Sequence, residues 1–230
     1  MTTYVLVHGA WGGAHGFRKV RPLLTAAGHD VFTPALTGIG ERSHLASPLV
    51  NLTTHIQDVV NVIRYHDLRD IVLLGFSYGG MVVTGSVSHI SDQVRHLVYL
   101  DAFLPDDGQS LNDLTGQPSY RVLGLGEQWL VPAPQREYED PAESAFAAPR
   151  RTPHPVGCFT EPVRLPQPLE DYTFGRTYIK ATVEEYPRAF WTAAERAKSS
   201  PAWSYREIAT NHMVPANRPG ELAEMLLELA

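Results

Sequence analysis

IVLLGFSYGGMVV, residues 71–83, is an apolar run interrupted by a serine with glycines on both sides. Residues 75–79 fit Gly-x-Ser-x-Gly, the sharp strand-to-helix turn that carries a nucleophilic serine. The glycines have a steric reason, because side chains two residues before and after Ser77 would collide where the strand and the helix cross. The pattern is short, and a second interpretation is an ordinary connection whose serine only caps the helix.

Strands and helices are expected to alternate through the first hundred residues. The apolar runs that predict strands are residues 3–9, 30–36, 70–76 and 94–103. The segments with helical spacing of apolar residues are 16–29, a segment from Thr53, and 78–90. This order predicts an α/β fold with a parallel sheet and helices on both faces. Because the serine motif falls where a buried strand is expected to end and a helix to begin, its context favours a nucleophile.

The alternation stops in the middle of the chain. Eleven of the eighteen prolines lie between Pro105 and Pro168, where neither long helices nor central strands can form. Residues 105–174 are therefore expected to form an inserted cap with about two short helices, and residues 1–104 and 175–230 to form the core. Such a long insertion is usually functional when it carries apolar side chains, as this one does.

Strand and helix order resumes after the insertion. The predicted elements are strands at 176–182 and 203–210, a helix at 187–198, and a last helix with Asn217 as its cap and Pro219 in its first turn. The sheet is therefore expected to have about six strands.

Composition excludes several classes of protein. The net charge of −6 and the lack of a basic run disfavour nucleic acid as a partner. No segment approaches the roughly 20 apolar residues that span a bilayer, and the start of the chain does not resemble a secretory signal. Cys158 is the single cysteine, so no internal disulfide forms. A cytoplasmic protein with no membrane partner is expected; the oligomeric state is left open, a homodimer included.

A serine nucleophile needs a base, and the base needs an acid to orient it. In this architecture the expected chain order is serine, then acid, then histidine. Of the ten histidines only His212 lies beyond the cap, in the loop after the last predicted strand. His212 is therefore the predicted base. His8 lies at a strand end before a glycine and is expected to be structural.

The developing negative charge on the substrate needs two backbone N–H donors, which form an oxyanion hole. One is expected from Tyr78, the residue after the nucleophile. The other is expected from the loop HGAWGG, residues 8–13, most simply from Ala10, with Trp11 as the alternative. Cys158 has no comparable turn around it and is expected to be an ordinary thiol.

Three stretches in this order, LVHGAWGG (6–13), GFSYGG (75–80) and NHMVPANRP (211–219), make the chain resemble the α/β-hydrolases. More narrowly, it is similar to the small esterases grouped with plant hydroxynitrile lyases and methyl-ester esterases. TGIGERSHL (37–45) and LVYLDAFLPDDGQS (97–110) are similar to bacterial members of that group. The resemblance covers nearly the whole chain. It implies a parallel-sheet core, a cap over the site, and ester hydrolysis without a cofactor or metal.

The sequence departs from the family at the acid. The family pattern places an aspartate after the strand that follows the cap, where this chain has YIKATVEEYP (178–187) and only Glu184 and Glu185. Asp101 ends the preceding predicted strand, a position from which some α/β-hydrolases draw the acid. Asp101 is therefore the first candidate, with Glu184 and Glu185 as alternatives. Its non-catalytic interpretation is a cap for the turn that opens the insertion.

The leading hypothesis is a serine hydrolase that cleaves a carboxylic ester with a small or medium hydrophobic or aryl group through an acyl-enzyme. Trp11, Tyr78 and Trp129 are positioned to touch the substrate. No basic clamp for a charged substrate is evident, although Arg42, Arg121 and Arg176 remain candidates.

Two rival functions use the same scaffold. Lyases that split cyanohydrins resemble one another in a threonine beside the oxyanion loop and a lysine next to the histidine, where this chain has Gly9 and Met213. A non-enzymatic receptor for a small ligand is the second rival, and slow turnover with tight binding would distinguish it.

Overall fold

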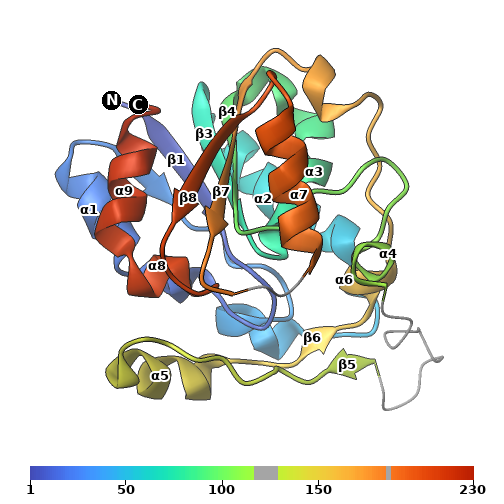
Figure 1. The fold of residues 1–230 in the computed structure, drawn as a ribbon. Helices are drawn as coiled ribbons and strands as arrows, with labels where there is room; N and C mark the ends of the chain where they lie inside the picture. Colours follow the sequence, from blue (N-terminus) through green and yellow to red (C-terminus); the bar gives the residue numbers. More distant parts are fainter. Residues whose placement is uncertain (117–128, 185–187) are drawn as a thin grey trace.

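Six parallel strands form the central sheet of the computed structural model, which describes residues 1–116, 129–184 and 188–230. Their spatial order is β2-β1-β3-β4-β7-β8 (Figure 1). The strands are β1 Thr3–Val7, β2 Asp30–Phe32, β3 Ile71–Phe76, β4 Val94–Leu100, β7 Gly175–Ala181 and β8 Ser204–Ile208. The prediction of an α/β fold with a mainly parallel sheet of about six strands is confirmed.

Helices connect these strands. The α-helices are α1 Val20–Ala26, α2 Leu52–Tyr65, α3 Gly79–Ile90, α4 Leu111–Thr115, α5 Pro141–Ala147, α6 Gly157–Thr160, α7 Arg188–Ser199, α8 Val214–Asn217 and α9 Pro219–Leu227. Short 3₁₀ helices are η1 Ala14–Phe17, η2 Gly40–Leu45, η3 Ser91–Gln93, η4 Ala148–Arg150 and η5 Leu169–Asp171. None of the helices in these described ranges combines the length and apolar character that crossing a bilayer requires.

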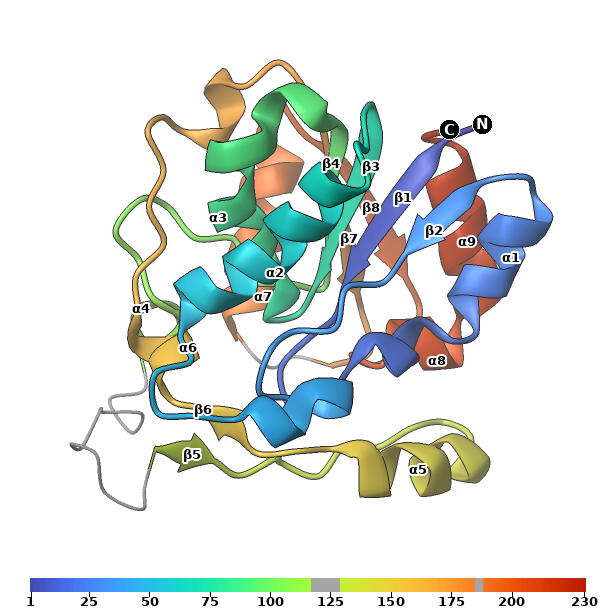
Figure 2. The ribbon, with the colours of Figure 1, turned by 180° about the vertical axis from the view of Figure 1, so that it is seen from behind.

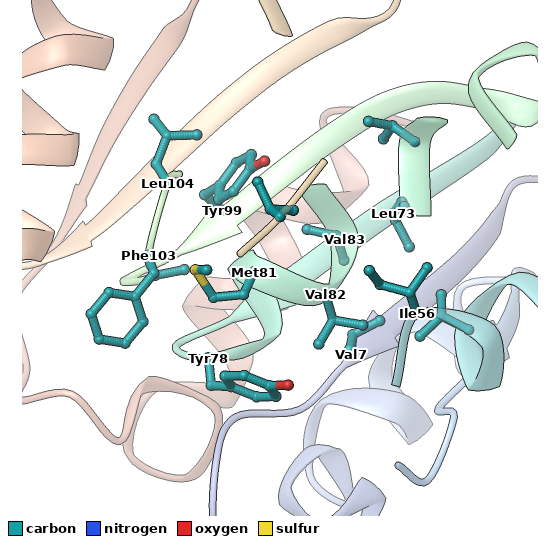
Figure 3. Packing of buried hydrophobic residues seen from close by; sticks show 14 of the residues in the cluster. Val7, Ile56, Leu73, Tyr78, Met81, Val82, Val83, Tyr99, Phe103 and Leu104 are labelled. Atoms are coloured by element: carbon teal, nitrogen blue, oxygen red, sulfur yellow. The ribbon is translucent and has the colours of Figure 1, made fainter. Parts of the chain in front are cut away.

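Helices cover both faces of the sheet, as Figures 1 and 2 show from opposite sides. The side chains of β1 show how the two helical layers are packed, because successive side chains of a strand point to opposite faces of the sheet. Tyr4 and Leu6 pack with α1 and α9, whereas Val5 and Val7 pack with α2 and α3. In Figure 3, Val7 lies close to Val82, on the layer that α3 supplies. Helix α3 is buried along most of its length, consistent with its almost wholly apolar sequence.

Three local predictions were wrong in detail. The helix expected at 16–29 is divided into η1 and α1, because Pro22 has no N–H and its ring excludes a helical carbonyl four residues earlier. The strand expected at 30–36 ends at Phe32, two residues before Pro34. Asn217 does not cap α9; it ends α8, and its side-chain amide donates to Thr210 and Asn211.

The inserted segment, predicted at residues 105–174, is described at residues 105–116 and 129–174, which lie outside the six-stranded sheet. They contain the three short helices α4, α5 and α6, and a two-stranded antiparallel pair formed by β5 Leu130–Val131 and β6 His154–Pro155. Figure 1 shows β5, β6 and α5 beside the edge at which the arrowheads of the parallel strands end. Since functional sites of open α/β sheets form at the carboxyl ends of the strands, the inserted segment borders the expected site.

Candidate active site

Ser77 occupies the turn between β3 and α3. Its backbone has a φ of 56°, in the left-handed region that residues other than glycine rarely adopt. The conformation is held by three backbone hydrogen bonds, since its N–H donates to Leu100 O (3.2 Å) and its carbonyl accepts from Gly80 (3.0 Å) and Phe103 (3.2 Å). A strained serine held from both sides is the arrangement that the Gly-x-Ser-x-Gly motif predicts.

The glycines around Ser77 fill positions that admit no side chain. A Cβ atom on Gly75 would lie 2.6 Å from the carbonyl oxygen of Gly79, and one on Gly79 would lie 2.6 Å from that of Val7. A Cβ on Gly80 would lie 2.1 Å from the carbonyl oxygen of Phe103. All three contacts are with backbone, which cannot move aside as the end of a side chain can. The steric reason given for these glycines in the sequence therefore applies in the fold.

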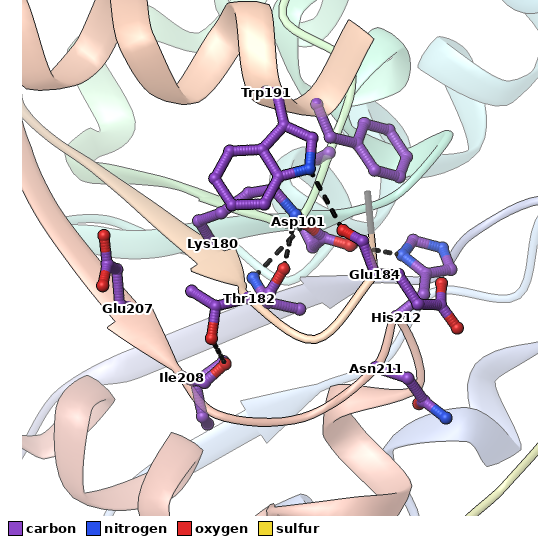
Figure 4. A network of polar contacts seen from close by, with 12 residues as sticks. Asp101, Lys180, Thr182, Glu184, Trp191, Glu207, Ile208, Asn211 and His212 are labelled. Carbon is purple, nitrogen blue, oxygen red and sulfur yellow. Dashed lines mark hydrogen bonds and ion pairs between the residues drawn. The ribbon is translucent and has the colours of Figure 1, made fainter. Parts of the chain in front are cut away.

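His212 and Asp101 are in direct contact at this edge of the sheet. Nδ1 of His212 donates to Oδ2 of Asp101 at 2.7 Å, and both side chains are almost fully buried (Figure 4). The His212 ring is stacked between Phe76 and Phe190, at centroid distances of 4.8 and 5.1 Å. With Nδ1 engaged, Nε2 is the nitrogen left to act as a base.

Phe76 lies between the histidine and the nucleophile in the sequence of contacts: its ring stacks on His212, and its backbone directly precedes Ser77. Within the described ranges no hydrogen bond joins Ser77 Oγ to His212. Catalytic contacts of this kind are often long in a free enzyme and tighten when substrate binds. The structure therefore brings His212 together with Asp101, and brings both beside Ser77.

The Asp101 carboxylate is held in its charged form. Burial alone would raise its pKa, but the hydrogen bond from His212 and the charges of His212 and Lys180 outweigh burial, and the pKa is lowered. Nζ of Lys180 lies 2.7 Å from Oδ1 of Asp101. A charged carboxylate can accept a hydrogen bond from Nδ1–H and stabilise a positive imidazole, which is what the acid of a serine hydrolase does.

Glu184 is the alternative acid that the structure describes, and it is not paired with His212. Glu184 lies after β7 at the edge of the cavity, and its backbone carbonyl accepts from Nε1 of Trp191 at 3.1 Å. No hydrogen bond or ion pair in the described part of the chain joins the Glu184 carboxylate to His212. Glu185 lies outside the described residues. Of the candidate acids that the structure describes, Asp101 is the one hydrogen-bonded to the histidine.

Ala10 and Tyr78 have the properties expected of oxyanion-hole donors. Both line the same cavity as Ser77. Among the residues described, neither backbone N–H makes a hydrogen bond, so both are available to a ligand. The N–H of Trp11, the alternative donor, is instead directed to Nδ1 of His154 at 3.3 Å. These observations favour Ala10 over Trp11.

Trp11 is fixed by the inserted segment. It has a φ of 58°, its carbonyl accepts from Thr152 N–H (3.0 Å), and its indole Nε1 donates to Val131 O (3.1 Å). Trp129 accepts a hydrogen bond at its carbonyl from Val156 and packs against the larger core cluster. Trp11 lines the cavity beside Ser77, whereas Trp129 is not among the described residues that line it.

The cavity above Ser77 has a volume of about 870 Å³, enough for a small organic molecule. Its apolar lining comes from the loop after β4, from α4 and from α7: Phe103, Leu104, Leu111, Leu114, Ala189, Phe190 and Ala193. Polar residues, including Asp106, Arg136, Glu184 and Arg188, also border it. Of the arginines considered from the sequence, Arg42 pairs with Asp58, Arg176 is buried against backbone carbonyls, and Arg121 lies outside the described residues.

His8 has a structural role, as its position before a glycine suggested. Its Nδ1 donates to Gly9 O (2.9 Å), and its Nε2 accepts from Leu36 N–H (3.2 Å). Burial lowers its pKa to about 4, so the ring is neutral at pH 7.

A buried cluster behind Tyr78 has donor atoms close enough to suggest a metal. The nearest ligand atoms of His55, His154 and Cys158 lie within 4.8 Å of one another. However, Nε2 of His55 donates to Thr37 O (2.7 Å) and its Nδ1 accepts from the Tyr78 hydroxyl (2.9 Å). Burial raises the pKa of the Cys158 thiol, whereas a metal requires the thiolate. The cluster fits a neutral, hydrogen-bonded support for Tyr78 better than a metal site.

Sequence reasoning missed the roles of Lys180, His154 and His55 around the site. Lys180 lies within the stretch considered for the acid, and a lysine between Ile179 and Ala181 in a predicted central strand was the available signal. No local signal marks His154 or His55, because their partners are distant in the sequence: Trp11 is 143 residues from His154, and Thr37 and Tyr78 are 18 and 23 residues from His55.

Comparisons with known proteins agree with the fold and with the resemblance stated from the motifs. The alpha/beta hydrolase family matches residues 4–225. A carbendazim-hydrolysing esterase from Nocardioides sp. (strain SG-4G) is 35% identical over 243 residues and covers all of both chains. An alpha-hydroxynitrile lyase from Arabidopsis thaliana is 30% identical over 104 residues, which are 45% of this chain and 40% of the lyase.

Among solved structures, an extracellular alpha/beta-hydrolase from a Paenibacillus species superimposes with a TM-score of 0.83 at 23% identity. The match covers 99% of this chain and 98% of that one. At this level of identity the similarity concerns the fold alone.

Proposed function

This chain belongs to the alpha/beta hydrolase family, and we propose that it is a serine esterase in which Ser77, His212 and Asp101 form the catalytic group. The observation that carries the proposal is the 2.7 Å hydrogen bond from His212 to Asp101, made at the sheet edge beside the strained Ser77. Esterase activity in a relative that is 35% identical over the whole chain supports the same class of reaction.

The proposed reaction has two halves. Ser77 Oγ attacks the ester carbonyl while Nε2 of His212 takes the hydroxyl proton, and the N–H groups of Ala10 and Tyr78 stabilise the negative oxygen. The tetrahedral intermediate collapses as His212 returns the proton to the leaving alcohol, and an acyl-enzyme remains. Water then attacks the acyl carbon with His212 as its base, which releases the acid and regenerates Ser77.

The proposed substrate is an ester with a small or medium hydrophobic or aryl group. The apolar lining of the cavity from Phe103, Leu111 and Phe190 would remove such a group from water at about 25 cal/mol for each Å² buried. The polar residues that also border the cavity could bind a polar end of the substrate. Tyr78 and Trp11 are the aromatic residues proposed to touch it.

A cyanohydrin lyase is the rival on the same fold, and Gly9 disfavours it. A Cβ at Gly9 would lie 2.9 Å from Cβ of Ser77 and 3.4 Å from its Oγ, so the threonine typical of the lyases does not fit here without movement. Met213 stands where those lyases have a lysine. The match to a lyase from Arabidopsis thaliana covers less than half of this chain.

The experiment that tests the proposal combines labelling and kinetics. The wild-type protein is treated with a fluorophosphonate, digested and analysed by mass spectrometry, and its hydrolysis of p-nitrophenyl acetate and butyrate is followed. We expect one adduct on Ser77, a burst of p-nitrophenol, and a loss of about 10³-fold or more in kcat for Ser77→Ala. Ser88→Ala, a change on the same helix away from the cavity, is the matched control and should keep full activity.

Three results would refute the proposal. An unlabelled Ser77 together with full activity of Ser77→Ala would exclude the nucleophile. Cleavage of a cyanohydrin with no hydrolysis of any ester in a panel that includes carbendazim would support the lyase instead. Tight binding of an aryl ester without turnover would support a receptor.

A further inference from the structure

Lys180 is a buried charged residue in contact with the acid of the proposed catalytic group. Its side chain is 2% exposed, as is expected of a lysine only when its charge is paired. It lies on β7, the strand beside β4, whose end carries Asp101. Figure 4 shows Lys180 on the side of Asp101 away from His212. The two carboxylate oxygens are thus divided, Oδ1 to Lys180 and Oδ2 to His212.

The ammonium group of Lys180 is satisfied in three directions. Nζ donates to Oδ1 of Asp101 (2.7 Å) and to the carbonyl of Ala181 (2.5 Å), and lies 4.4 Å from the centroid of the Trp191 ring. These contacts compensate the cost of removing a charge from water. They also leave the lysine little freedom to move.

Strand β7 holds Asp101 with its backbone as well. The Asp101 N–H donates to Ile179 O (2.7 Å), and the N–H of Ala181 donates to Oδ1 of Asp101 (3.3 Å). Asp101 itself has a φ of 40°, in the left-handed region that residues other than glycine adopt infrequently, and these hydrogen bonds hold it there. Three successive residues of β7 therefore orient an acid that belongs to another strand.

We propose that Lys180 is a positioning residue of the catalytic group. Lys180 orients the Asp101 carboxylate toward His212, and its positive charge reduces the electrostatic stabilisation that Asp101 gives to protonated His212. The inference rests on the proposed function, because it concerns the acid of that group. It also explains how Asp101, at the end of β4, can act as the acid of the catalytic group in a chain that has no aspartate after β7.

The charge effect has a definite sign. An isolated Asp101 carboxylate would favour the protonated imidazole of His212, but the positive charge of Lys180 offsets part of that attraction. Removing the lysine charge makes His212 easier to protonate. Because protonated His212 cannot act as a base, activity on the acid side is then lost at a higher pH.

Other titratable side chains lie near the Asp101–Lys180 pair, from strands β7 and β8 and the loop after β7. Burial raises the pKa of Tyr178, whose hydroxyl donates to Ala102 O, and that of Tyr205 on β8, so both remain neutral in the relevant range. Glu184 from the loop after β7 and Glu207 from β8 are the carboxyl side chains that Figure 4 labels nearby. Helix α7 contributes Trp191, which does not titrate.

The test uses Lys180→Met and Lys180→Gln, with Lys198→Met as control. Lys198 also lies near an aromatic ring, that of Tyr205 at 5.4 Å, but is exposed on α7. The kcat/KM for a p-nitrophenyl ester is measured from pH 4.5 to 9. We expect the midpoint of the acid limb to rise by about one pH unit in both Lys180 variants, since neither carries the charge. Lys180→Met should also lose about tenfold in plateau kcat with little change in KM, and Lys180→Gln, which keeps a donor, should lose less.

An unchanged acid limb in folded Lys180 variants would overturn the inference and make Lys180 a structural residue only. Absence of hydrolysis and of Ser77 labelling in the wild-type protein would instead refute the proposed function.

Discussion

The backbone N–H of Trp11 lies 3.3 Å from Nδ1 of His154, although 143 residues separate them in the sequence. Trp11 follows Ala10, the proposed oxyanion donor, and His154 belongs to β6 of the inserted segment. The segment therefore does more than border the cavity, because it fixes the loop whose N–H groups would meet the substrate. His154 is fully buried and burial lowers its pKa well below the usual value, so Nδ1 stays a neutral acceptor.

Replacing His154 tests this link. We expect His154→Phe to lower kcat about tenfold with KM nearly unchanged, because relaxation of the left-handed Trp11, worth roughly 1–2 kcal/mol, turns the loop away. His154→Asn places an oxygen near the position of Nδ1 and should restore most of kcat. Steady-state kinetics on a p-nitrophenyl ester measures both, with His89→Phe on exposed α3 surface as control. Equal loss in the Asn and Phe variants would argue against an acceptor role.

The choice of acid predicts unequal effects at two carboxylates. Asp101→Asn should lower kcat by about 10³- to 10⁴-fold, because Nδ1 of His212 then loses its anionic acceptor. The matched change Glu184→Gln should stay within about threefold, since no hydrogen bond or ion pair in the described ranges joins its carboxylate to His212. Kinetics under saturating substrate compares them. A deeper loss in Glu184→Gln would move the acid to the loop after β7.

Asp101→Asn should also destabilise the fold. It leaves Lys180 buried without its partner, and breaking a buried ion pair in this way costs about 3–5 kcal/mol. Urea unfolding of Asp101→Asn and of Asp101→Asn combined with Lys180→Met measures the effect. The double variant should be the more stable of the two, and the reverse order would mean that the pair is not the cause.

The turn glycines predict a sharp contrast in stability. Gly75→Ala puts a Cβ within 2.6 Å of the Gly79 carbonyl oxygen, and should lower the free energy of unfolding by about 3 kcal/mol. Gly16→Ala, in η1, meets nothing within 4 Å and should stay within about 1 kcal/mol of wild type. Chemical denaturation of both variants gives the comparison, and similar losses would show that the crossing of β3 and α3 adapts easily.

Buried neutral histidines predict acid sensitivity. Burial lowers the pKa of His8 and of His55 to about 4, below the ordinary value of 6.5. Between pH 6.5 and 4 the unfolded chain binds protons that the folded chain does not, so stability is lost as the pH falls through that window. Between pH 7 and pH 5, each of these two histidines should lower the free energy of unfolding by about 2 kcal/mol.

Urea unfolding at pH 7 and pH 5 checks this effect. His55→Gln should reduce the difference between the two values of pH by about 2 kcal/mol, because one titrating group is gone. His66→Gln, on the exposed end of α2, should not change it. If the free energy of unfolding falls by the same amount between pH 7 and pH 5 in wild type and in His55→Gln, other groups cause the acid sensitivity.

Cys158 should be unreactive in the folded protein. It is buried and burial raises its pKa, so almost no thiolate exists at pH 8. We expect labelling by iodoacetamide to be at least about 100-fold slower in the native state than in 6 M urea, as mass spectrometry would show. Rapid labelling of the native protein would mean that the His55 cluster opens without global unfolding.

Local patterns were enough for most of the fold. The alternation of strand and helix periods predicted the parallel sheet and its core layers, because these periods follow from backbone geometry wherever the segment lies. The motif at 75–79 predicted the turn for the same reason, since its glycines answer a clash between adjacent elements. The prolines led to the prediction of an insertion with about two short helices; its described residues form α4, α5, α6 and the β5–β6 pair, which the sequence did not indicate.

Tertiary structure alone decided which groups meet. The sequence left Asp101, Glu184 and Glu185 open, because each follows a strand at the same sheet edge and nothing local says which side chain reaches His212. Strand order places β7 beside β4, so that Lys180 and the Ala181 N–H turn Asp101 toward the histidine. The contacts of His154 with Trp11 and of His55 with Tyr78 likewise join residues far apart in the chain. Periodicity and turns are properties of neighbouring residues, whereas a hydrogen bond requires two atoms within about 3 Å, a distance that only the packed chain sets.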